Sequence, residues 1–246
     1  MNRYLPLPAS AHAADIDGML SHVHVMILVL FAGWAIYFLY VLWRFRSSRQ
    51  SVSAAQGARG RIAMGIFAAV VITESVLLVA FGLPLWFERI SAAPRGGGPP
   101  LVVRVVAEQF MWNVHYAGPD GEFGSTSVDL VSSTNPLGLN RRSPGGRDDI
   151  VLLSEIHVPI NRPVVVQLSS KDVIHSFGVP AMRVKQDAIP GLRAPVWFTP
   201  TVLGEFEIAC SQLCGVGHHR MRGVIHVKSA EAFDAYMKEE AALQVK

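Results

Sequence analysis

Two long apolar segments dominate the first third of the chain. Residues 23–43 read VHVMILVLFAGWAIYFLYVLW, and residues 62–87 read IAMGIFAAVVITESVLLVAFGLPLWF. A helix rises about 1.5 Å per residue, so about 20 apolar residues cross a hydrocarbon core of about 30 Å. Both segments are long enough, and each ends in aromatic residues that suit the headgroup interface. The pattern predicts that residues 1–91 form a hairpin of two transmembrane helices.

The polar loop between these segments predicts the orientation of the hairpin. It carries no acidic residue, and cations close to a membrane span favour the cytoplasmic side. We therefore expect a cytoplasmic loop in a bacterial-type inner membrane, with both termini on the periplasmic side. The apolar stretch before residue 20 is short and is interrupted by two prolines, so we interpret this segment as an N-terminal lead-in rather than a signal peptide. The loop cations are Arg44, Arg46, Arg49, Arg59 and Arg61.

The pattern changes after the hairpin from long apolar runs to short ones. Residues 92–100 (AAPRGGGPP) read as a linker, and residues 229–246 begin with a Ser N-cap candidate and have helical spacing. Between them, short β-like runs separated by turns favour a small sandwich or barrel over residues 101–228. The fold class expected is therefore an α+β membrane protein. The predicted strands are 101–107, 110–116, 163–168, 173–179, 195–199, 204–209 and 223–227.

Charge excludes a nucleic-acid partner for the part beyond the hairpin. The whole chain carries a formal charge of +3, but residues 91–246 hold 15 Lys or Arg and 15 Asp or Glu. A neutral domain has no basic stripe for phosphates, so the positive excess belongs to the membrane part. Residues 132–149 lack apolar periodicity and predict a long surface loop.

Candidate chemistry is concentrated in residues 210–221, which read CSQLCGVGHHRM and contain the only two cysteines. Thiolate, imidazole and thioether form a soft ligand set that suits copper better than magnesium or calcium. Gly215 and Gly217 predict a turn, and His175 is a candidate ligand from a distant strand. On composition alone a disulfide between the cysteines stays open, because the exported side of a membrane is oxidising.

Residues 172–227 resemble the copper domain of cytochrome c oxidase subunit II. The spacing Cys-x3-Cys-x3-His-x2-Met, the upstream His-Ser-Phe, the EQFMW strand at 108–112 and the hairpin all match, so the resemblance covers nearly the whole chain. It implies a cupredoxin-like Greek-key β-barrel with a dinuclear copper centre, CuA. In that family two cysteines bridge the coppers, each of two histidines binds one copper, and a methionine and a backbone carbonyl complete the set. The implied ligands are His175, Cys210, Gln212 through its carbonyl, Cys214, His218 and Met221.

The resemblance also implies a function and partners. The subunit is expected to accept electrons from cytochrome c and pass them to the haem of catalytic subunit I, where oxygen is reduced to water and protons are translocated. Subunit III is a further expected partner, and the donor is a soluble, membrane-bound or fused cytochrome c. The chain has no oxygen-reducing site of its own.

Two positions depart from the usual family pattern, Gln212 and Phe110, and Glu74 in the second span is a separate candidate. Gln212 replaces a glutamate that helps to hold magnesium, so we do not expect that second metal. Phe110 stands where the family has its electron-accepting tryptophan, and Trp112 shares its strand face, so both are candidates for that role. Glu74 lies within the second span, where an ionisable residue is costly. It is a proton-path candidate, with a polar contact to a neighbouring helix as the alternative.

Other polar residues carry weaker expectations. His219 neighbours the implied ligand His218 but does not fit the family spacing, and we expect it either at the surface or packed behind the ligands. Three histidines on predicted strands have no partner in sequence and are expected to be structural: His115, His157 and His226. Four acidic residues are candidates for steering a basic cytochrome, with a solvated face as the alternative: Asp172, Glu155, Asp129 and Glu122.

Three other functions compete with the subunit II interpretation. A quinol-oxidase-type subunit would have the same fold without the metal, and the intact ligand set argues against it. A membrane-anchored copper carrier would favour one exchangeable ion over a bridged pair. The fused copper domain of a nitric oxide reductase has a similar local motif and stays open.

Overall fold

The computed structural model describes residues 5–46, 60–90 and 98–244, which form two compact units. One unit contains residues 15–46 and 60–90, and the other contains residues 5–14 together with residues 98–244. The predicted division at residue 91 therefore needs a correction at the N-terminus. Ala9 N–H donates to the carbonyl of Ala181 at 2.8 Å, and Thr201 N–H donates to the carbonyl of Ala9 at 2.9 Å. These backbone bonds attach the lead-in segment to the β unit.

The first unit is a pair of long apolar helical segments. Helix α1 (Ala13–Arg44) contains the first predicted span and begins ten residues before it. The second segment runs continuously through α2 (Gly60–Val76), a π-helical turn η1 (Leu77–Gly82) and α3 (Leu83–Ile90). Both have a mean hydropathy of 2.4, and their large apolar side chains are exposed. They are two candidate transmembrane helices. Arg49, Arg59 and residues 92–97 of the predicted linker lie outside the described residues.

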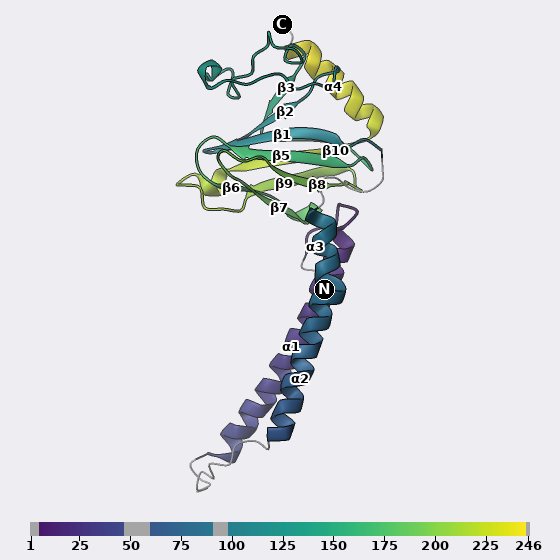
Figure 1. The fold of residues 1–246 in the computed structure, drawn as a ribbon, viewed down its shortest axis with the longest axis vertical. Helices are drawn as coiled ribbons and strands as arrows, with labels where there is room; N and C mark the ends of the chain where they lie inside the picture. Colours follow the sequence, from purple (N-terminus) through teal and green to yellow (C-terminus); the bar gives the residue numbers. More distant parts are fainter. Residues whose placement is uncertain (1–4, 47–59, 91–97, 245–246) are drawn as a thin grey trace. The chain divides into compact units, whose positions relative to one another are not determined.

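The second unit is a sandwich of two five-stranded sheets (Figure 1). Strand β1 pairs in parallel with β5 in the first sheet, and β10 pairs in parallel with β4 in the second. The first sheet has the order β3 (Ile150–Leu153), β2 (Met111–Tyr116), β1 (Leu101–Glu108), β5 (Val164–Ser170) and β8 (Ala194–Phe198). The second has the order β4 (Glu155–Pro159), β10 (Arg222–Lys228), β9 (Gly204–Cys210), β6 (His175–Val179) and β7 (Val184–Ala188).

The predicted fold class is confirmed, with two apolar helices, a β-sandwich and a C-terminal helix. Each of the seven predicted strands lies within two residues of an observed one. Three strands were missed: β3, β4 and β7. All three lie at the edges of their sheets, where a strand pairs on one side only and can be short and polar. Strand β7 reads VKQDA, which carries no alternating apolar pattern.

The hydrophobic core lies between the two sheets and includes Trp112, Phe177, Phe198, Ile208 and Ile225, all fully buried. Alternate residues of each strand point inward, so one apolar row per strand fills this layer.

Helix α4 (Ala230–Gln244), the yellow helix in Figure 1, contacts β3, β4 and β10. Its start is capped by the Ser229 hydroxyl, which accepts from Ala232 N–H at 3.2 Å. Near its end, the Gln244 side chain bonds both the N–H and the carbonyl of Val151. The helix is therefore tied at both ends to the β unit.

The long loop before β3 is anchored rather than open. Asp149 is fully buried, and its carboxylate lies 2.6 Å from His115 Nε2 and accepts from Gly124 N–H at 2.8 Å. Leu137 and Leu139 are also buried. Residues 132–149 form the predicted loop, and most of them are exposed or half-buried, but the loop is fixed by these three buried side chains.

Candidate metal centre

The candidate metal centre forms where β9 ends and β10 begins. Strand β9 stops at Cys210, and residues 211–221 turn back through a short 3-10 helix, η4 (His218–Arg220), into β10. Gly215 adopts a φ of +136°, a conformation that L side chains rarely adopt, so glycine permits the turn. Strand β6 begins at His175 and pairs with β9, with Phe177 opposite Cys210. Sheet pairing therefore places the distant histidine beside the cysteine loop.

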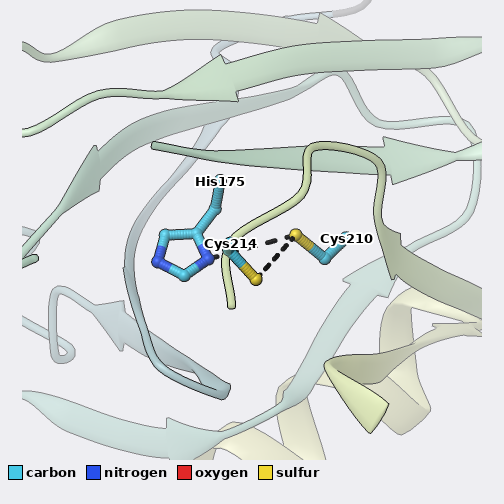
Figure 2. A group of neighbouring side chains, drawn as sticks. All are labelled: His175, Cys210 and Cys214. Carbon is cyan, nitrogen blue, oxygen red and sulfur yellow. Dashed lines mark hydrogen bonds between the residues drawn. The ribbon is translucent and has the colours of Figure 1, made fainter. Parts of the chain in front are cut away.

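The two cysteines face each other as free thiols (Figure 2). Their sulfur atoms lie 3.7 Å apart, well beyond the disulfide bond length of about 2.05 Å. The disulfide that composition left open is therefore not formed. Cys210 Sγ lies 4.0 Å from His175 Nδ1, and Cys214 Sγ lies 3.6 Å from His218 Nδ1. Each sulfur thus has one imidazole beside it.

The remaining two predicted donors lie at the same point. Met221 Sδ is 3.1 Å from His175 Nδ1 and 3.8 Å from Cys214 Sγ. The carbonyl oxygen of Gln212 is 3.2 Å from Cys210 Sγ. The structure therefore brings all six predicted donors together. His175, Met221 and both cysteines are buried, so these soft donors face one another in a dry environment that fits copper.

Burial controls the protonation of the Cys214 thiol. Desolvation, followed by the hydrogen bond with Cys210, raises the pKa of Cys214 to about 11. Without a metal, this thiol is therefore protonated at neutral pH. Metal ligation needs the thiolate, so binding must displace protons from the site.

A hydrogen-bonded shell orients the candidate ligands. Asp172 Oδ1 lies 2.8 Å from His175 Nε2, and Asp172 Oδ2 accepts from the N–H of Gln109 at 2.8 Å. The Gln109 side chain donates to the carbonyl of Cys214 at 2.6 Å. Burial pushes the pKa of Asp172 upward, but hydrogen bonds from His175 and from the N–H groups of Gln109 and Val173 outweigh it and lower the pKa.

Gln109 was not among the predicted site residues, and Asp172 was predicted only as a steering charge. A carboxylate three residues before a histidine ligand was the signal available for Asp172. No local signal exists for Gln109, whose target is 105 residues away along the chain.

Phe110 and Trp112, both candidates for accepting electrons, occupy different environments. Phe110 is half-buried and packs on the cysteine loop, so closely that a Cβ on Gly217 would overlap its ring. Trp112 is fully buried, and its ring meets that of Phe177 edge-on at 5.6 Å between centroids. A surface role for Trp112 is therefore excluded, because its side chain belongs to the core of the sandwich.

The other predicted polar residues lie away from the candidate metal centre. Glu74 is exposed on α2, and Asp129 and Glu122 are exposed in the connection between β2 and β3. His219 is exposed on η4, outside the group of donors.

Two of the three histidines expected to stand alone have each other as neighbours, and a steering candidate joins them. Ligand atoms of Glu155, His157 and His226 lie within 4.8 Å of one another. Sequence spacing did not predict this group, because its members come from two strands about 70 residues apart in the chain.

The fold and the donor group define a class of protein. A two-sheet sandwich that gathers two thiols, two imidazoles and a thioether, from the β9–β10 loop and the start of β6, is a cupredoxin-like domain with a candidate copper centre. The family model for cytochrome c oxidase subunit II, periplasmic domain, matches residues 101–230. The chain belongs to the cytochrome c oxidase subunit II family.

Two relatives that are each 34% identical agree with this assignment. Cytochrome c oxidase subunit 2 of Cereibacter sphaeroides is 34% identical over 94% of this chain and 78% of its own length. The alternative cytochrome c oxidase subunit 2 of Bradyrhizobium diazoefficiens is 34% identical over 66% of this chain, and that match spans 58% of the relative. The crystal structure of the periplasmic domain of subunit II of cytochrome oxidase of Bradyrhizobium japonicum is 28% identical, with a TM-score of 0.45. The match covers 61% of this chain and 99% of the chain in that crystal structure.

Proposed function

We propose that this chain is the electron-accepting subunit of a haem–copper oxidase and that its donor group holds the dinuclear copper centre CuA. The observation that carries the proposal is the pair of thiols 3.7 Å apart with one imidazole beside each sulfur. Two thiolates placed in this way would suit a pair of copper ions, whereas a single-copper site needs only one thiolate. When bound, the centre supplies one-electron transfer.

The protein's own residues hold the donors in place and keep water away. Asp172 accepts from His175 Nε2, which leaves Nδ1 as the ligating nitrogen. Gln109 holds the cysteine loop through the Cys214 carbonyl. Gln212 contributes its backbone carbonyl, and its neutral amide is a poor magnesium ligand, so we propose a site without the second metal of the family.

We propose that electrons arrive from cytochrome c, soluble or attached to the membrane or to the complex. The contact between half-buried Phe110 and the cysteine loop is the candidate route from the surface. Electrons leave to the haem of catalytic subunit I, which with subunit III completes the complex and reduces oxygen to water coupled to proton translocation. The two candidate transmembrane helices would anchor the domain on the periplasmic side of the inner membrane, with the arginine-rich loop in the cytoplasm.

Copper loading of the full chain in detergent tests the proposal. We expect two copper ions per chain, a purple colour and a seven-line hyperfine pattern in the EPR spectrum. The matched control is His219→Gln, which removes an exposed histidine beside the ligand His218 and should leave both ions bound. One ion per chain with a four-line signal would indicate a copper carrier instead. Co-purification with a nitric-oxide-reducing large subunit, rather than an oxygen-reducing one, would contradict the oxidase assignment.

A further inference from the structure

The outward face of the second sheet carries a row of metal-ligating side chains away from the copper donors. In the strand register, His226 of β10 lies opposite His157 of β4 on one side and opposite Glu205 of β9 on the other. Neighbouring strands are about 4.8 Å apart, so these three residues are adjacent on one face. Glu155 precedes His157 by two positions in β4 and therefore points to the same face.

Three of the four ring nitrogens in this row are buried and make no hydrogen bond among the described residues. His157 is 4% exposed, and neither of its ring nitrogens makes a hydrogen bond among the described residues, although Glu155 lies within ion-pair distance of Nε2. The Nε2 atom of His226 is likewise buried and unpartnered. Nearly all buried polar groups in folded proteins are hydrogen-bonded, so three such nitrogens side by side indicate a missing ligand.

One carboxylate lies beside each of the two imidazoles. Glu155 Oε2 lies 3.5 Å from His157 Nε2. Glu205 Oε1 lies 3.3 Å from His226 Nδ1, which leaves Nε2 of that ring free, as in the carboxylate–histidine–metal arrangement of many metal sites. Glu155, Glu205 and Glu207 also line a surface groove of about 500 Å³ on this face.

We propose that Glu155, His157 and His226 form a second metal site, separate from the copper centre, for a divalent cation such as Zn²⁺. Two imidazoles and a carboxylate suit zinc or copper(II) better than magnesium or calcium. Three protein ligands leave one tetrahedral position for water from the groove. The inference does not depend on the proposed electron-transfer function, because it uses none of the six copper donors.

The arrangement of the rings predicts what binding would change. The His157 and His226 rings are stacked with centroids 4.4 Å apart, and Tyr236 of α4 stacks on the other face of His157 at 3.9 Å. The lone pair of an imidazole nitrogen lies in the plane of its ring, so the lone pairs of two stacked rings point in parallel planes and do not meet at one point. At least one imidazole must therefore rotate for both to bind the same ion. The ion would then link the edge strand β4 to β10 beneath α4.

Zinc binding to the full chain in detergent tests the site. A Cys210→Ser/Cys214→Ser background removes the thiols that would otherwise take up zinc, so failure of the copper proposal does not affect the result. We expect one zinc equivalent that a large excess of Mg²⁺ does not displace, measured by equilibrium dialysis and metal analysis. Glu205→Gln should weaken binding about 10- to 100-fold. His226→Gln should abolish it, and His219→Gln should leave it unchanged.

A second measurement locates the ion without any change at the site. With Cu²⁺ bound there, ascorbate as the reductant and dissolved oxygen as the oxidant, the oxygen species formed at the ion should oxidise His157 and His226 selectively. Mass spectrometry would map the added oxygen, and Zn²⁺ should block the oxidation. Equal zinc binding in the His226→Gln variant, or oxidation that spares both histidines, would overturn the proposal.

Discussion

Asp172 Oδ1 lies 2.8 Å from His175 Nε2, while Nδ1 of the same imidazole faces Met221 Sδ at 3.1 Å. One ring thus connects a carboxylate at the rim to the buried donor group. Because the carboxylate accepts a hydrogen bond from the Nε2–H group, Nδ1 keeps its lone pair for a metal and becomes a stronger ligand. Asp172 is held in turn by the N–H of Gln109, so its own position is defined by the backbone of the β1–β2 turn.

Asp172→Asn should weaken copper binding while the fold persists. An amide is neutral and a weaker acceptor than a carboxylate, so His175 becomes less basic and less well oriented. We expect the copper affinity to fall about 10- to 100-fold in a competition titration with a chelator. Asp129→Asn, at an exposed loop position, is the matched control and should not change it. Equal affinities for the wild type and Asp172→Asn would contradict the role assigned to this contact.

Gly217→Ala should destabilise the cysteine loop. The added Cβ would overlap the Phe110 ring close to its point of attachment, where the ring cannot easily move away. Overpacking of this kind costs about 1–3 kcal/mol of the free energy of unfolding, measurable by chemical denaturation. Adding Phe110→Ala to Gly217→Ala should recover part of that cost, because it removes the opposing atoms. Strictly additive losses in the double variant would show that the two residues do not press on each other.

Asp149→Ala should release the long loop before β3. The change leaves His115 and the N–H of Gly124 buried without their acceptor. Breaking one partner of a buried pair costs about 3–5 kcal/mol, and we expect that loss in the free energy of unfolding together with faster proteolysis within residues 117–149. Asp148→Ala, which removes only one 3.3 Å hydrogen bond to Asp120 N–H, is the matched control. A loop equally resistant to protease in both variants would contradict the anchor.

Tyr116 should make the β unit sensitive to alkaline pH. Burial raises the pKa of its phenol above the ordinary value, so the folded state holds this proton more tightly than the unfolded state. The resulting stability is complete below pH of about 10 and is lost progressively above it. Tyr116→Phe removes bonds to the N–H and carbonyl of His157 and should cost about 1–3 kcal/mol at neutral pH. The variant should also lose stability less steeply above pH 10, and parallel slopes in unfolding titrations would count against the interpretation.

Glu74→Gln tests the proton-path hypothesis in the assembled oxidase. If the carboxylate carries protons, an amide of the same shape should slow both oxygen turnover and proton translocation, because it cannot release a proton at physiological pH. Thr73→Val, at the neighbouring position of α2, controls for the loss of a polar group without a titratable one. Unchanged turnover and translocation in Glu74→Gln would leave only a structural contact for this residue.

Local information was sufficient for much of the candidate copper centre and of the fold. The spans follow from hydropathy over about 20 residues, and strands such as β1 and β10 follow from alternation within a few residues. The donors from Cys210 to Met221 lie in one loop, so their spacing alone indicates a common site. His175 was the single distant ligand, and the family motif around it supplied what spacing did not.

Contacts between segments that are distant in sequence decided the surroundings of the candidate copper centre, the anchoring of the β2–β3 connection and the row of histidines on the second sheet. The burial of Trp112, the bond from Gln109 to the Cys214 carbonyl and the pairing of Asp149 with His115 each depend on how the two sheets and their loops pack. The row of His157, His226 and Glu205 exists only because β4 and β9 lie on either side of β10. A sequence records which side chains each strand presents, but strand order and register determine which of them become neighbours, and these are properties of the folded chain.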